Sequence, residues 1–145
     1  MENLRLSETN LKTLMIQLNA EINDAATNIA HKIVNDEIKN VLSYPPSPDD
    51  LLSENEIEAL KEIQKIPFAE VALKKIIAEG VATAFFGLLN SIDGTDDPKK
   101  EFGEWKGVAL IDRSFVDGDP YDFMLHDAMF EMYWEWKNLK EKNGE

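Results

Sequence analysis

Cysteine is absent from the 145 residues of the chain, which excludes disulfide bonds, thiolate metal sites and cysteine nucleophiles. Basic residues are scarce: 15 lysines and arginines stand against 28 aspartates and glutamates, and the formal net charge is −13. Because no basic stripe is present to neutralise phosphates, we expect no binding to nucleic acid. The sequence also lacks the run of about 18 apolar residues that a membrane-spanning helix needs. We therefore expect a soluble protein with no membrane partner.

The length and the missing cysteine favour one domain in a reducing compartment. A chain of this size buries roughly 70% of its unfolded surface without disulfides or metals. Glu2 stands where a secretory signal peptide carries positive charge, and the lack of cysteine suits the cytoplasm. We expect a cytoplasmic protein in which residues 1–145 form a single domain.

The most apolar stretch covers residues 67–92 and ends at Asp93 and Gly94, which suit a left-handed helix cap. Its apolar residues recur every three or four positions, which predicts a helix, and its charges are confined to the first half. A helix that is apolar all round must be covered by other elements, so we expect this one to be central. Phe85 and Leu88 should then be nearly fully buried.

A long helix is predicted at the start of the chain. Apolar residues at helical spacing cover residues 7–42, with Ser7 as the N-cap. The pattern fits either one helix or two helices with a break within 23–28. Three prolines within residues 43–50 end the helix and form a rigid connector rather than a domain boundary.

The next helix begins at a capping box. Ser53 and Glu56 have the S-x-x-E spacing, in which each side chain accepts a hydrogen bond from the backbone of the other residue. Leu52 and Ile57 occupy the positions of the hydrophobic staple that often accompanies such a box. These features predict a short helix over residues 54–65.

The only strand candidate is the short apolar run at 105–112. Its partner is either residues 115–116, as the second half of a hairpin, or a second subunit. Asp119 then suits the N-cap of a final helix over 120–139. The predicted fold is mainly α, a single helical domain of about four helices with one small β element near 105–116.

The final helix carries the candidate binding surface. Residues 117–145 contain eight acidic and three basic residues, and aromatic and methionine side chains stand between the carboxylates. Aromatic residues and methionine are favoured where proteins meet, and carboxylates around them would attract a basic protein. The alternative is that the helix packs between neighbours and buries two faces. The candidate interface residues are Asp122, Asp127, Phe130, Glu131, Trp134 and Glu135.

The loop after Asp93 resembles a calcium-binding loop in spacing alone. Oxygen-bearing side chains stand at the first, third, fifth, ninth and twelfth positions, as in an EF-hand. However, Pro98 occupies the sixth position, where the sharp turn needs glycine. We therefore interpret the segment as a helix cap followed by a solvated acidic loop, and we expect no metal site.

No catalytic constellation is evident. His126 has Asp122 one helical turn before it, and His31 is the only other histidine. A metal site or an acid–base pair would need further ligands or a nucleophile, so a surface pair is the preferred interpretation. Glycine-rich phosphate loops, G-x-S-x-G and H-E-x-x-H are all missing. We expect neither enzymatic activity nor a cofactor.

Small residues lie on adjoining turns of the 67–92 helix, at Gly80, Ala84 and Gly87. They would let another helix approach closely, and glycine inside a helix is costly unless such a contact compensates for it. We expect this contact to lie within the chain, with a homodimer interface as the alternative.

Three runs give the sequence a resemblance to small acidic bacterial proteins whose function is uncharacterised. They are GVATAFFGLLNSIDGTDDP at 80–98, WKGVALID at 105–112 and LHDAMFEMYWEW at 125–136. The resemblance covers about residues 50–137. Its motifs consist of apolar and turn residues, so it implies no catalytic or binding role for any of them.

Taken together, these features predict a non-enzymatic, protein-binding acidic protein. The concrete form is an immunity or antitoxin-like protein whose acidic surface covers a basic partner. One alternative is a structural or regulatory subunit that self-associates. The other is an enzyme that uses carboxylates with His126.

Millimolar calcium should leave the melting temperature almost unchanged if the loop after Asp93 is only a cap and a solvated turn. Specific binding to the native state would have to raise that temperature by mass action. Thermal unfolding with and without calcium checks this. A saturable rise that disappears in Asp93→Asn would contradict the prediction.

Overall fold

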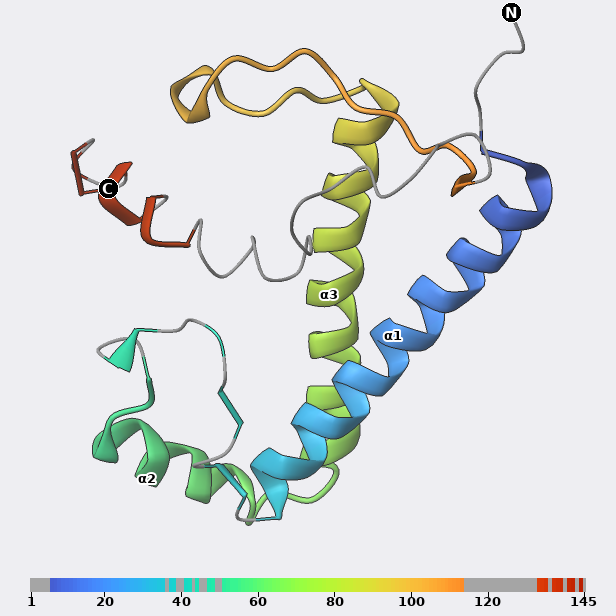
Figure 1. Ribbon diagram of the computed structural model, residues 1–145. Coiled ribbons are helices and arrows are strands. Elements are labelled where there is room, and N and C mark those ends of the chain that lie inside the picture. The colour runs from blue at the N-terminus through green and yellow to red at the C-terminus, as the bar shows by residue number, and fades with distance from the viewer. Residues whose placement is uncertain are drawn as a thin grey trace, which may run out of the picture. The chain divides into compact units, whose positions relative to one another are not determined.

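The computed structural model confirms a mainly α fold (Figure 1). Its helices are α1 (Glu8–Val34), α2 (Glu54–Ile63), α3 (Ala69–Asp93) and the short 3-10 helix η3 (Lys100–Phe102). None of the helices in the described part of the chain is long and apolar enough to cross a membrane. The structure describes residues 6–35, 37–38, 41–42, 44, 47–48, 51–113, 133–135, 137–139, 141–142 and 144.

The chain divides into two compact units. One unit comprises Ile16–Phe85, and the other comprises Met1–Met15 together with Phe86–Glu145. The division falls inside α1 and inside α3, so each long helix contributes to both units. The single domain expected for residues 1–145 stays a prediction.

Helix α1 is one continuous helix, so the predicted alternative with a break within 23–28 is wrong. The hydroxyl of Ser7 accepts a hydrogen bond from the backbone N–H of Asn10 at 3.3 Å, which confirms Ser7 as the N-terminal cap. The helix ends at Val34, eight residues earlier than predicted. There the backbone N–H and the side-chain amide of Asn35 both donate to the carbonyl of His31, at 3.0 and 2.9 Å.

Helix α2 begins as predicted. The hydroxyl of Ser53 accepts from the backbone N–H of Glu56 at 3.3 Å, and the Glu56 carboxylate accepts from the Ser53 N–H at 2.6 Å. Just after the helix, the side-chain amide of Gln64 donates to the carbonyl of Ile33 at 2.9 Å. That bond satisfies one of the free carbonyls at the end of α1 and joins α1 to α2.

Helix α3 begins and ends in left-handed backbone. Phe68 has φ +64° and its carbonyl accepts from the Ala72 N–H at 3.1 Å, so it occupies the N-cap. A bulky side chain rarely adopts this conformation. Gly94, with φ +70°, follows the last turn, and the Thr95 N–H donates to the carbonyl of Asn90 at 3.0 Å. This is the Schellman bond that a glycine cap provides, and it confirms Gly94 as the cap.

The expected burial of α3 is wrong. No described residue of α3 is buried, Leu88 is 57% exposed and Phe85 is only half-buried. Helical spacing correctly predicted the helix, but it does not reveal whether another element covers a given face. The described part of the chain has five buried apolar residues, and none of them comes from α3: Ala26, Ala30, Ile33, Ile38 and Tyr133.

The predicted strand at 105–112 is also wrong. Those residues carry neither helix nor strand, and all of 104–110 are exposed. Gly107 has φ +83°, which interrupts extended backbone, and no described segment pairs with the run. The second half of the hairpin proposed at 115–116 lies outside the described residues. Of the predicted final helix, residues 133–135 and 137–139 are helical, and residues 120–132 lie outside the described residues.

Truncation of Leu88 should therefore cost little stability. We expect Leu88→Ala to lower the free energy of unfolding by less than about 1 kcal/mol, because an exposed side chain leaves no cavity. Ile33→Ala, in the buried part of α1, is the matched control and should cost about 2–5 kcal/mol. Urea unfolding of both variants measures the difference. Equal and large losses would show that α3 is covered.

Candidate functional site

Only part of the predicted interface lies in the described residues. Trp134 is 46% exposed and Glu135 is exposed, whereas the neighbouring Tyr133 is only 5% exposed. The rings of Tyr133 and Trp134 meet edge to face, with centroids 5.3 Å apart. The Lys137 ammonium lies 6.0 Å from the centre of the Trp134 ring. The other predicted interface residues lie outside the described residues: Asp122, Asp127, Phe130 and Glu131.

The acidic loop after α3 forms ion pairs with neighbouring lysines. Glu101 lies 3.8 Å from Lys99, and Glu104 lies 3.7 Å from Lys106. The hydroxyl of Thr95 donates to Asn90 of the preceding helical turn. Within the described ranges, no three acidic, histidine or cysteine side chains are grouped as a metal ion would require.

His31 forms a small polar cluster at the surface. Its Nδ1 lies 3.3 Å from Glu70 Oε1 and 3.0 Å from the side-chain nitrogen of Asn35. The cluster joins the last turn of α1 to the first turn of α3, and its side chains are exposed. It offers no nucleophile, so a structural link explains it better than catalysis. His126 and its predicted partner Asp122 lie outside the described residues.

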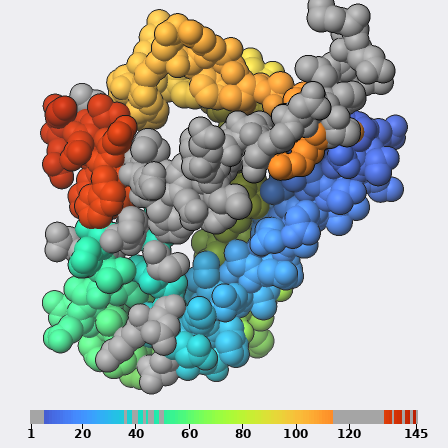
Figure 2. Space-filling view, in the orientation of Figure 1, coloured from blue at the N-terminus to red at the C-terminus, as the bar shows by residue number. Residues whose placement is uncertain are grey.

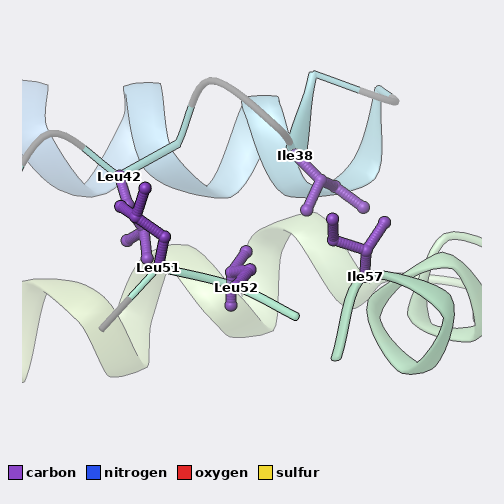
Figure 3. A pocket seen from close by; sticks show the side chains of 5 residues that line it. All are labelled: Ile38, Leu42, Leu51, Leu52 and Ile57. Atoms are coloured by element: carbon purple, nitrogen blue, oxygen red, sulfur yellow. The ribbon is translucent and has the colours of Figure 1, made fainter. Parts of the chain in front are cut away.

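The described residues line an aliphatic pocket of about 230 Å³ (Figure 3). Two of its side chains come from the segment after α1, two from the segment before α2 and one from α2 itself. The side chains of Ile38 and Ile57 point toward each other across it. An apolar cavity of about 150 Å³ already accepts benzene, so this pocket has room for one large apolar side chain. It is lined by Ile38, Leu42, Leu51, Leu52 and Ile57.

Sequence reasoning found this pocket only in part. Leu52 and Ile57 were predicted to form the staple of the capping box, and both line the pocket. Ile38 and Leu42 were assigned to the first helix, yet they follow its end. The signal that was available is the Leu51–Leu52 pair directly after the proline-rich connector, because both leucines line the pocket.

Helix α2 places negative charge beside the pocket. Helix α2 is drawn in green in Figure 2, and its four glutamates are exposed. The pKa of Glu56 is lowered by the backbone N–H and the hydroxyl of Ser53. The pKa of Glu58 is lowered by the Lys61 ammonium at 2.6 Å. Both groups are therefore ionised at neutral pH. The exposed glutamates of α2 are Glu54, Glu56, Glu58 and Glu62.

Asp112 holds the segment after η3 to the start of α1 (Figure 1). Its Oδ1 accepts from the Ser7 N–H at 3.0 Å and from the Asn10 side-chain amide at 2.8 Å. These bonds lower the pKa of Asp112, the Ser7 backbone bond most of all. A carboxylate at a helix N-terminus is favoured by the free N–H groups there. Sequence reasoning missed this contact because it joins positions far apart in the chain.

Comparisons of the chain with protein-family models, with curated proteins and with solved structures found no match. Its function therefore has to be inferred from its own residues. Two surfaces carry that inference: the aliphatic pocket beside α2, and the exposed aromatic residue Trp134.

Acid should weaken the unit that contains Asp112. Because its folded pKa is lowered, Asp112 adds stability above its unfolded pKa of about 3.9, and this stability is lost as pH falls through the folded value. Asp112→Asn should flatten the loss of stability below about pH 4. Denaturant unfolding at several pH values measures it. Asp96→Asn, in a loop of the same unit, is the control, and identical profiles for the two variants would contradict the assignment.

Proposed function

We propose that the protein is a non-enzymatic, cytoplasmic binding protein whose acidic surface covers a basic protein partner, in the manner of an immunity protein or antitoxin. The net charge of −13 supports a basic partner, because charge complementarity speeds encounter and disfavours wrong partners. The absence of cysteine supports the compartment. No feature of the described residues calls for a cofactor.

The observation that carries the proposal is the position of the pocket. A cavity lined only by aliphatic side chains adjoins a ten-residue helix with four glutamates and a single lysine. Residues 49–62, which include all of this helix except Ile63, contain six acidic residues and one basic residue. Interfaces commonly combine an apolar anchor in a pocket with a charged rim, and this arrangement provides both.

The arrangement defines the chemistry of the partner. An aliphatic or aromatic side chain of about the size of phenylalanine fills the pocket, and lysines or arginines around it meet the glutamates of α2. Trp134 and Glu135, with the predicted interface residues beside them in the sequence, supply a second acidic and aromatic contact. Self-association is a second candidate function, which the exposed face of α3 favours.

The test starts from a basic partner captured from the native host and measures its binding kinetics. Glu54→Lys combined with Glu58→Lys should slow association about ten-fold at low salt and flatten its salt dependence, because rim charges act mainly through steering. Leu51→Ala, at the exposed edge of the pocket, should instead speed dissociation.

The matched control is Asp96→Lys combined with Asp97→Lys, which changes the net charge equally in a loop after α3. It should alter association much less than the α2 double variant. Trp134→Ala should speed dissociation if the last segment also contacts the partner. Association that is indifferent both to salt and to the α2 double variant would refute the proposal and leave the acidity a matter of solubility.

A further inference from the structure

One face of α3 is exposed and consists of uncharged, mostly small residues. Ala72, Ile76, Gly80 and Thr83 recur at spacings of three and four residues, so they share one side of the helix. All four are exposed, and Ile76 is 69% exposed. This set of four residues is called the α3 face below. All of its members belong to the unit Ile16–Phe85.

Gly80 has no explanation within the described chain. A glycine inside a helix is less stable than alanine, and a close contact with another backbone is the usual compensation. A Cβ atom added to Gly80 would meet nothing within 4 Å. The prediction that this glycine serves packing within the chain is therefore not supported by any described residue.

Two opposite charges flank the α3 face on the same side. Lys75 and Glu79 are both exposed, one helical turn apart. Neither forms an ion pair with a described residue, although Lys61 in α2 and Lys65 just after α2 both pair with glutamates. A cation and an anion on one flank, neither of them paired with a described residue, are what a self-complementary contact requires.

We propose that the α3 face packs antiparallel against the α3 face of a second copy of this chain. In a two-fold symmetric contact the same patch meets itself, and residue i of one copy lies opposite residue j while j lies opposite i. When two identical helices pack antiparallel, a given flank of one copy lies beside the same flank of the other. Lys75 of one copy therefore faces Glu79 of the other, and this pair forms twice.

The same two-fold axis satisfies the apolar contacts. With the axis near residues 77 and 78, Ile76 of each copy lies opposite Gly80 of the other, so a large side chain enters the space that a glycine leaves. The Lys75–Glu79 pair is centred on residue 77, and the Ile76–Gly80 pair is centred on residue 78. The two best positions of the axis therefore differ by one residue, a rise of about 1.5 Å. Side chains of this length accommodate that offset.

The contact area is small, so we expect the dimer to be weak. Half of one helix covers less than the roughly 800 Å² per partner of a standard stable interface. The dimer therefore forms reversibly at micromolar concentrations. It uses α3 and leaves the pocket beside α2 free, so it does not depend on the proposed basic partner.

Sedimentation velocity over a series from low to high micromolar concentration tests the proposal. The wild-type chain should show a reversible monomer–dimer equilibrium. Lys75→Glu and Glu79→Lys should each weaken association about ten-fold, because each brings like charges together twice. The double variant that carries both changes should restore wild-type association, since the swapped charges again face opposite partners. The control pair is Lys12→Glu and Glu8→Lys in α1, with the same spacing and the same changes of net charge, and neither should alter association.

Variants of Gly80 give an independent test, in which the melting temperature and the strength of the dimer change in opposite directions. Gly80→Ala should raise the melting temperature, because alanine favours helix and meets no neighbour, while it weakens the dimer. Gly80→Leu should remove the dimer and leave a folded monomer by circular dichroism. A wild-type chain that stays monomeric throughout the series would overturn the proposal. So would a dimer that keeps its strength in Gly80→Leu, or a charge swap that fails to restore association.

Discussion

Helix α3 carries more apolar surface than the described part of the chain covers, and the other features of the molecule have to be understood from that constraint. A helix with apolar residues on every side is stable in water only where other groups bury them. Yet Ile76 and Leu88 are both more than half exposed, and the buried residues belong to other segments. Exposed apolar surface of this kind marks sites where proteins associate. The self-association proposed for this chain begins from that imbalance.

The unit Ile16–Phe85 supplies a framework on which such surfaces are held in place. Gln64 joins α2 to the end of α1 through the carbonyl of Ile33, and His31 joins α1 to the start of α3 through Glu70. Both bonds lie at helix ends, and the Gln64 bond also satisfies a carbonyl of α1 that would otherwise lack a partner. The pocket and the α3 face lie on different elements of this framework, so the surface proposed for a basic partner and the surface proposed for a second copy are separate.

Local features were predictable from the sequence, and long-range features were not. The capping box of Ser53 and Glu56 and the glycine cap at Gly94 depend on residues within a few positions, and both were predicted. The burial of Leu88 depends on what the rest of the chain places over it, and periodicity cannot reveal that. The contact of Asp112 with Ser7 spans 105 positions and has no local signal.

The pocket beside α2 likewise combines local features that were predicted with long-range features that were not. The staple residues Leu52 and Ile57 were predicted as a pair, but the pocket also needs Ile38, which comes from beyond the end of α1. The first helix was expected to continue through residue 42, and a continuous helix there would not form this pocket. The strand at 105–112 was predicted from a short apolar run, although Gly107 and the lack of a partner in the described residues leave the run unpaired.

The central claim is that Ile76 is open to solvent in the monomer and is covered by a second copy. Because the chain has no cysteine, the single variant Ile76→Cys reports on that position alone when its rate of thiol labelling is measured at increasing protein concentration. Ile33→Cys, at a buried position, gives the reference for a covered thiol. We expect fast labelling at low concentration and progressive protection as the concentration rises. Slow labelling at every concentration would show that the chain covers α3 itself, and fast labelling at every concentration would show that no second copy binds there; either result contradicts the claim.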